Sequence, residues 1–114
     1  MSVNKDITHN FKVQDANRYG VEKAVVLSAL RYFIENNIKN KDIIYYHKDY
    51  YWFTISAKDL SYILPYYTQS KVQRLLKQLE IEKAVITGNF NYNSYDRTKW
   101  YTMPEYYTKN DWRV

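Results

Sequence analysis

The stretch SAKDLSYILPYYTQSKVQRLLKQLE, residues 56–80, carries the signals for two helices joined by a short turn. Ser56 is a typical helix N-cap residue, and Asp59 follows it three positions later, where a capping box has its acidic residue. A proline at position 65 cannot continue a helix, so a short helix over residues 57–64 is expected to stop there. A second helix is predicted to begin after this turn.

The second predicted helix, capped by Thr68 or Ser70, runs to about Glu82 and has one apolar face. Its apolar residues recur at i, i+3, i+4 and i+7, the spacing of a buried stripe. A helix-turn-helix places such a helix in the major groove, where glutamine pairs with adenine, lysine with guanine, and further cations neutralise phosphates. A merely solvated face is the alternative for an isolated amphipathic helix, but the cap, short helix and proline turn before it favour DNA binding. The predicted contacts on this helix are Thr68, Gln69, Ser70, Lys71, Gln73, Arg74 and Lys77.

Upstream of this pair, the sequence predicts a buried helix and a short strand. Residues 21–37 are apolar apart from a narrow polar stripe, as in a largely buried helix. Residues 15–19 form one helical turn, opened by an aspartate cap and closed by a glycine. Residues 38–49 are polar and are predicted to be a loop, whereas the aromatic and β-branched residues 50–55 predict a strand.

Downstream, residues 85–90 and 98–103 are predicted to be two strands joined by a hairpin tip over 91–97. The order helix, strand, helix, helix, strand, strand is that of a winged helix-turn-helix. The predicted fold class is therefore α+β, with a three-helix core, a short strand and a C-terminal β-hairpin wing. The predicted divisions are a flexible N-terminus (1–10), a winged-helix domain (11–103) and a C-terminal tail (104–114).

The hairpin tip is the second predicted DNA contact, through Asn91, Asn93, Arg97 and Lys99. These side chains offer hydrogen-bond donors and positive charge to a DNA backbone or minor groove, and the tyrosines between them could lie against sugars. The alternative is that the tip is simply rich in turn-forming residues, as hairpin tips are. Three aromatic residues in the predicted strands are expected in the core rather than on a base-stacking platform: Trp52, Trp100 and Tyr101.

Composition limits the classes of function. Among 114 residues there is no cysteine, which excludes disulfides, thiolate zinc sites and thiol nucleophiles. The formal net charge is +5, and residues 66–103 contribute +3 of it, which suits a nucleic-acid partner. There is neither a signal-peptide pattern nor an apolar run long enough to span a membrane, so a cytoplasmic protein without a membrane partner is expected.

The sequence does not predict an enzyme, a cofactor or a metal site. His9 and His47 stand far apart and in no metal-binding spacing. A tyrosine nucleophile of the rolling-circle type would need a histidine pair beside it, so the 14 tyrosines alone do not indicate nicking. Gly20 and Gly88 are the only glycines, which leaves no glycine cluster for a phosphate-binding loop.

The sequence contains five runs that belong together: GVEKAVVL (20–27), YW (51–52), VQRLLKQLE (72–80), TGNFN (87–91) and DRTKWY (96–101). In their order and spacing these runs resemble the N-terminal winged-helix domain of bacteriophage and plasmid replication initiators and replisome organisers. The resemblance covers about residues 11–103 and implies duplex DNA binding at a replication origin, through the third helix and the hairpin by position. The family tends to have glycine after the third helix, where this chain has Lys83, so a strained cap or a longer helix is expected. The helicase-recruiting or self-assembling role of the family's separate C-terminal domain is not carried over to these 114 residues.

Two functions follow from these patterns. The first is a non-enzymatic duplex DNA-binding protein of phage or plasmid type, acting in replication initiation or transcriptional regulation, for which a homodimer is natural on palindromic DNA. The alternative is a standalone winged-helix protein-interaction module, for example a small phage-encoded inhibitor that binds a replication or host protein complex. The tyrosine-rich residues 43–53 would then be the interface, because exposed tyrosines make low-entropy anchors.

Overall fold

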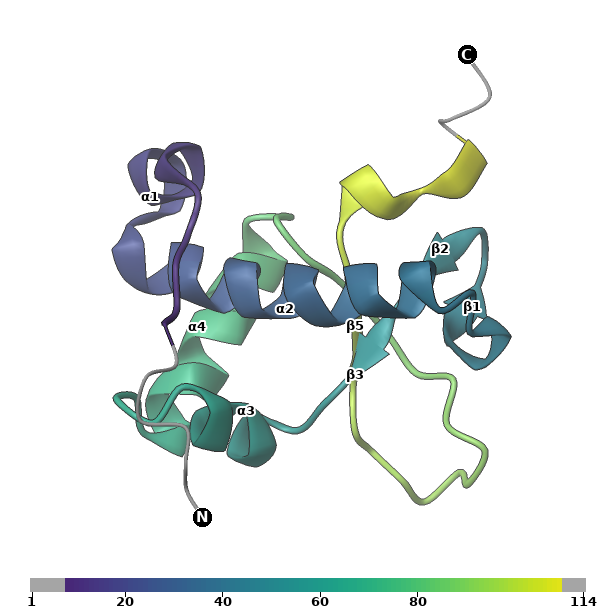
Figure 1. Cartoon of the computed structure of the whole chain (residues 1–114). Helices are drawn as coiled ribbons and strands as arrows, with labels where there is room; N and C mark the ends of the chain where they lie inside the picture. Colours follow the sequence, from purple (N-terminus) through teal and green to yellow (C-terminus); the bar gives the residue numbers. More distant parts are fainter. Residues whose placement is uncertain (1–7, 110–114) are drawn as a thin grey trace.

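The helix α2 (Val21–Lys39) crosses the molecule, and the other elements pack along it (Figure 1). A computed structural model describes residues 8–109, in which four α-helices accompany two small antiparallel sheets. The predicted α+β class is confirmed. The other helices are α1 (Val13–Tyr19), α3 (Ala57–Ile63) and α4 (Gln69–Ile81); the strands are β1 (Tyr46–His47), β2 (Tyr50–Tyr51), β3 (Phe53–Thr54), β4 (Ile86–Gly88) and β5 (Trp100–Thr102); two 3-10 turns are η1 (Ile43–Tyr45) and η2 (Pro104–Tyr106).

The corner between α1 and α2 is made by Gly20, as predicted. Its φ of 93° lies in a region that residues with a Cβ rarely adopt, and it both ends α1 and begins α2. The predicted aspartate cap is wrong: α1 begins at Val13 with Lys12 at the N-cap position. Asp15 lies within the first turn instead, where its carboxylate binds Arg31 of α2.

The two caps predicted for α3 and α4 are confirmed. The Oγ of Ser56 accepts a 3.0 Å hydrogen bond from the backbone N–H of Asp59. The Oγ1 of Thr68, and not Ser70, caps α4 by accepting a 3.1 Å bond from the N–H of Lys71. Each bond satisfies one of the amide groups that have no partner in the first turn of a helix.

The helix α4 ends in the strained cap expected from Lys83. This residue has a φ of 64°, and its N–H and that of Ala84 donate back to the carbonyl oxygens of Glu80 and Leu79. That pair of bonds is a Schellman motif, in which glycine is the favoured residue. The turn sends the chain directly into β4.

The three-stranded sheet has the order β3-β5-β4, which places the predicted early strand beside the C-terminal hairpin. Thr54 of β3 and Gly88 of β4 both pair with Trp100 of β5. Gly88 is needed for a close approach, because an added Cβ would lie 2.9 Å from the ring of Phe90 and 3.2 Å from that of Trp52.

The predicted single strand over 50–55 is interrupted at Trp52. Its N–H donates to the carbonyl of Tyr45, and its own carbonyl accepts a 2.8 Å bond from the buried side-chain amide of Asn37. The prediction of a loop over 38–49 is also wrong in part, because α2 continues to Lys39 and the chain then forms η1, β1 and the turn into β2.

One hydrophobic core joins the helices to the sheet. It contains Leu27 and Leu30 of α2, Leu60 of α3 and Leu75 of α4, all almost fully buried. The apolar stripe predicted for α4 is confirmed, since Val72, Leu75, Leu76 and Leu79 are its buried residues. This packing fixes the direction in which the polar face of α4 points.

The chain after β5 packs onto α2 and β2 over the residues that are described. The hydroxyl of Tyr106 donates a 2.6 Å bond to Glu35, and Tyr107 forms an antiparallel bridge with Tyr50. Near the other end, His9 and the Tyr66 hydroxyl are joined by a 2.8 Å hydrogen bond. The rest of the predicted flexible N-terminus, residues 1–7, and the rest of the predicted C-terminal tail, residues 110–114, lie outside the described part.

Candidate nucleic-acid interface

The polar face of α4 is exposed over most of its predicted DNA contacts. Because the opposite stripe is buried in the core, these side chains point away from the protein. Neither Arg74 nor Lys77 takes part in an ion pair with any other described residue, so both charges are free to meet phosphates. The exposed contacts are Gln69, Ser70, Gln73, Arg74 and Lys77.

Two of the predicted α4 contacts are already engaged within the protein. The Thr68 hydroxyl is the N-cap of the helix. Lys71 forms a salt bridge with Glu22 of α2, and its ammonium lies 5.3 Å from the ring centre of Tyr67. A lysine held in this way is a weaker candidate for a base contact than the prediction assumed, because DNA would have to displace Glu22.

The β4–β5 loop, residues 89–99, is the second part of the predicted interface and swings below the sheet at the lower right of Figure 1. Asn91 shapes it from the inside: its amide donates 2.9 Å bonds to the carbonyls of Asp96 and Thr98, and its Oδ1 accepts a 2.7 Å bond from the Trp100 indole. Asn91 thus holds the loop together, and its side chain has no free polar atom for DNA.

The remaining predicted contacts of the loop differ in how they are held. Asn93 and Arg97 are exposed, and the Arg97 guanidinium has no ion-pair partner among residues 8–109. Lys99 lies 3.5 Å from the carboxylate of Glu80 on α4. Within the described part of the chain, the loop therefore offers one cation without an ion-pair partner, Arg97, and one that is tied to α4, Lys99.

A groove of about 490 Å³ joins α4 to the β4–β5 loop. Gln73 and Lys77 line it from the helix, and Arg97 and Lys99 line it from the loop, so the structure brings residues of the two predicted contact regions together. Its floor includes Tyr101, whose burial, helped by the charge of Glu80, raises the pKa of its hydroxyl to about 12. At neutral pH the groove thus combines an uncharged tyrosine with a surplus of positive charge.

Glu80 lies in this groove and was not among the predicted site residues. A hydrogen bond from the Thr87 hydroxyl, 2.8 Å long, lowers the pKa of its carboxyl group, and Lys99 lowers it further. The carboxylate therefore stays ionised and links α4, β4 and the loop. Its position three residues after Lys77, on the same side of the helix, was the signal in the sequence.

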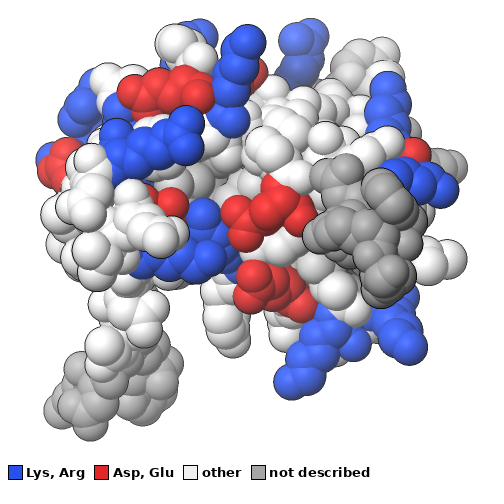
Figure 2. All heavy atoms as spheres, turned by 90° about the horizontal axis from the view of Figure 1, so that it is seen from above, with Lys and Arg blue, Asp and Glu red and all other residues white. Residues whose placement is uncertain are grey.

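The face of the molecule that carries α1 and η2 bears charges of both signs. Seen from above in Figure 2, acidic side chains lie among basic ones on that face. Arg31, for example, is paired with Asp15 at 2.5 Å and with Glu105 at 3.3 Å. A phosphate backbone is attracted to a net positive charge, to which an arginine paired in this way adds little.

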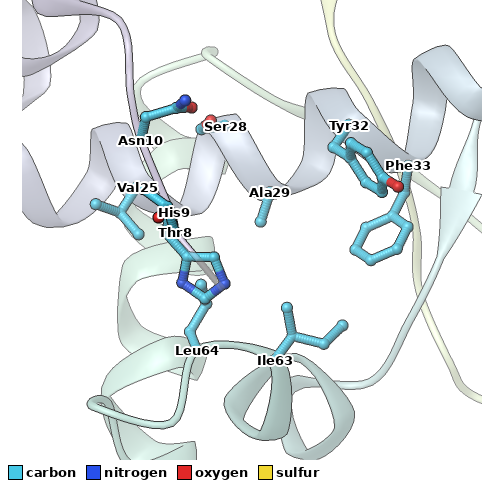
Figure 3. A pocket seen from close by; sticks show the side chains of 10 residues that line it. All are labelled: Thr8, His9, Asn10, Val25, Ser28, Ala29, Tyr32, Phe33, Ile63 and Leu64. Carbon is cyan, nitrogen blue, oxygen red and sulfur yellow. The ribbon is translucent and has the colours of Figure 1, made fainter. Parts of the chain in front are cut away.

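A second hollow, of about 370 Å³, lies between α2 and α3 (Figure 3). Val25, Ala29 and Phe33 of α2 face Ile63 and Leu64 across it, and Thr8 to Asn10 pass along its edge. His9 and Tyr32 are the ionisable side chains of the described lining, which is otherwise formed by apolar and uncharged polar residues.

Within residues 8–109, no three histidine, aspartate or glutamate side chains lie close enough together to hold a metal ion. No helix of this part of the chain has the length and apolar character needed to cross a membrane.

The exposure of the aromatic residues agrees with one expectation from the sequence and contradicts another. Trp52, Trp100 and Tyr101 are buried, which confirms their predicted place in the core. The tyrosines of residues 43–53, however, are only partly exposed, and all of them pack on other aromatic rings, so the premise of exposed tyrosine anchors there is wrong. The strongly exposed apolar side chains of that stretch belong to Ile43 and Ile44.

Comparison with protein-family models, with curated proteins and with solved structures found no match to this chain.

Proposed function

We propose that this chain is a winged helix-turn-helix protein that binds duplex DNA without catalysing a reaction on it. In this proposal α3 and α4 form the helix-turn-helix, α4 enters the major groove, and the β4–β5 loop is the wing that follows the adjacent backbone. The protein acts in the cytoplasm, in replication initiation or transcriptional regulation of a phage or plasmid.

The groove between α4 and the β4–β5 loop carries this proposal. Gln73 and Lys77 line it from the exposed helix face, and Arg97 lines it from the loop. Neither Lys77 nor Arg97 has an ion-pair partner among residues 8–109. Glutamine side chains suit base edges, and the flanking Arg74, Lys77 and Arg97 suit phosphates on either side. The three-stranded sheet anchors the loop beside the helix, so that both elements can reach one duplex.

The proposal is tested by fluorescence anisotropy of a labelled duplex across a series of salt concentrations. Log affinity is expected to fall linearly with log salt, and Arg74→Ala and Lys77→Ala are each expected to reduce the slope by about one unit. Lys39→Ala is the matched control, because it removes one positive charge in the last turn of α2, outside the predicted contacts. Absence of duplex binding at low salt, or equal effects of Arg74→Ala and Lys39→Ala, would overturn the proposal.

A protein partner is the second candidate function, and it is favoured by the exposed side chains of Ile43 and Ile44. Two adjacent isoleucines that are exposed to water can anchor a replication or host protein. Ile43→Ser together with Ile44→Ser should abolish capture of a stoichiometric partner while duplex affinity stays unchanged. Loss of duplex affinity in this variant would contradict a separate protein-binding surface.

A further inference from the structure

Tyr92 and Tyr95 are the most exposed large side chains with apolar character among residues 8–109. Their relative exposures are 107% and 88%, and they flank the tip of the β4–β5 loop. Most tyrosines of this chain are at least partly covered by other residues, and burial of a ring stabilises the folded protein. A ring that is fully in water gives no such stabilisation. Both faces of the two rings are therefore available to a partner.

The loop presents these rings from an ordered turn. The Oδ1 of Asn93 accepts a 2.8 Å bond from the N–H of Tyr95, and the Asn93 carbonyl accepts a 3.0 Å bond from the N–H of Asp96. Asn91 closes the base of the loop through its three hydrogen bonds. Because the backbone of the turn is already ordered, less conformational entropy is lost when the rings on it meet a ligand.

Positive charge lies directly beside the rings. Arg97 follows them in the loop without an ion-pair partner in the described part of the chain, and Lys99 lies at the base. Asp96 is the one acid of the loop, and its carboxylate is engaged by the N–H of Thr98 at 2.9 Å. Exposed aromatic faces next to cations are the features by which proteins bind single-stranded nucleic acid, through stacking on bases and contact with phosphates.

We infer that Tyr92 and Tyr95 stack on unpaired bases next to the duplex held by α4, so that the preferred ligand is a junction between double-stranded and single-stranded DNA. This inference rests on the proposed duplex binding. In an intact duplex the faces of the bases are covered by their neighbours and only base edges are exposed in the grooves. An aromatic ring therefore finds a free base face only where pairing or stacking has ended.

The test compares a blunt duplex with the same duplex carrying a single-stranded extension of about ten nucleotides. Anisotropy gives both affinities, and 2-aminopurine in the extension reports stacking through loss of its fluorescence. The variants are Tyr92→Ala and Tyr95→Ala, with Tyr92→Phe and Tyr95→Phe to retain the rings. Tyr32→Ala is the control, because Tyr32 is also exposed but lies on α2 beside the apolar hollow.

The wild-type protein is expected to prefer the extended duplex and to quench 2-aminopurine. Each alanine variant should weaken binding to the extended duplex by about 5- to 100-fold, with blunt-duplex affinity unchanged, whereas the phenylalanine variants and Tyr32→Ala should behave as wild type. Equal wild-type affinity for the two ligands overturns the inference, as does an equal loss on both ligands, which would place the rings on paired DNA. Unchanged affinities in the alanine variants also overturn it and leave the rings to a protein partner.

Failure of this inference differs from failure of the proposed function. Blunt-duplex binding that depends on Arg74, without any junction preference, overturns only the stacking role. Absence of blunt-duplex binding at low salt overturns both.

Discussion

The indole Nε1 of Trp100 donates a 2.7 Å hydrogen bond to the Oδ1 of Asn91, and this bond joins the buried sheet to the exposed β4–β5 loop. Trp100 lies in the middle of the three-stranded sheet, paired with both β3 and β4. The loop that forms the second part of the candidate interface is thus held by a side chain of the core.

Asn91→Ala should lower the free energy of unfolding by about 1–3 kcal/mol, because it leaves the largely buried indole N–H without its partner. Urea denaturation gives this value. Asn93→Ala is the matched control: it removes the same side chain two residues further on, where only one exposed amide depends on it, and should cost less than about 1 kcal/mol. An equal cost for the two variants would contradict the assigned role of Asn91.

Lys83→Gly should raise the free energy of unfolding by about 1 kcal/mol, because glycine adopts the φ of 64° at the end of α4 without a steric penalty. Lys83→Ala separates this effect from that of the charge, since alanine also has a Cβ and should give almost no gain. Thermal unfolding of the three proteins is sufficient. A gain in the alanine variant as large as that in the glycine variant would show that the charge, and not the backbone, is responsible.

Much of the helical part of the fold could be predicted because its signals are local. The caps Ser56 and Thr68, the corner at Gly20 and the apolar spacing within α4 each depend on residues within one or two turns. Residues 40–52 could not be predicted in this way. Their path is set by distant partners, such as the bond from Asn37 to the carbonyl of Trp52, and a polar stretch with such partners has the same composition as a loop.

The candidate site was predictable as a region but not residue by residue. The periodicity of α4 correctly gave the exposed face that contains Gln73 and Arg74. The sequence gives no sign that Lys71 meets Glu22, because the two residues are brought together only when α2 packs on α4. Asn91 shows the same limit. Asparagine is common in turns, and its presence does not reveal whether its amide faces solvent or forms hydrogen bonds within the loop.

Arg31 should be the residue whose loss most weakens the packing of α1 and η2 on α2. Burial opposes its charge, but hydrogen bonds and charge interactions with Asp15 and Glu105 outweigh this and raise its pKa. Arg31→Met should cost about 2–3 kcal/mol, because Asp15 is largely buried and loses its counter-charge. Glu105→Gln should cost less than about 1 kcal/mol, since that carboxylate is 44% exposed.

A double-mutant cycle tests whether this cost comes from the pair with Asp15. Arg31→Met combined with Asp15→Asn should be more stable than the sum of the two single effects predicts, because the double variant no longer buries an unpaired carboxylate. Additive effects in urea denaturation would show that Arg31 acts through packing of its aliphatic stem and not through the ion pair.

Glu80 should contribute to stability only above acidic pH. The hydrogen bond from Thr87, followed by the charge of Lys99, lowers the pKa of its carboxyl group in the folded protein below the unfolded value of about 4.3. Such a group adds stability above its unfolded pKa and loses that contribution as pH falls through the folded pKa. The difference in unfolding free energy between wild type and Glu80→Gln should therefore shrink as the pH is lowered from about 6 to about 3.

The same substitution should strengthen duplex binding a few-fold at neutral pH, since it removes a negative charge from the groove and releases Lys99 toward phosphate. Glu105→Gln removes an equal charge beside Arg31 and is the control, for which duplex affinity should stay unchanged. Anisotropy at low salt measures both, because the electrostatic difference is largest there. Weaker duplex binding by Glu80→Gln would show that the main role of this carboxylate is to position the β4–β5 loop. The salt bridge with Glu80 would then place Lys99 for its contact with DNA.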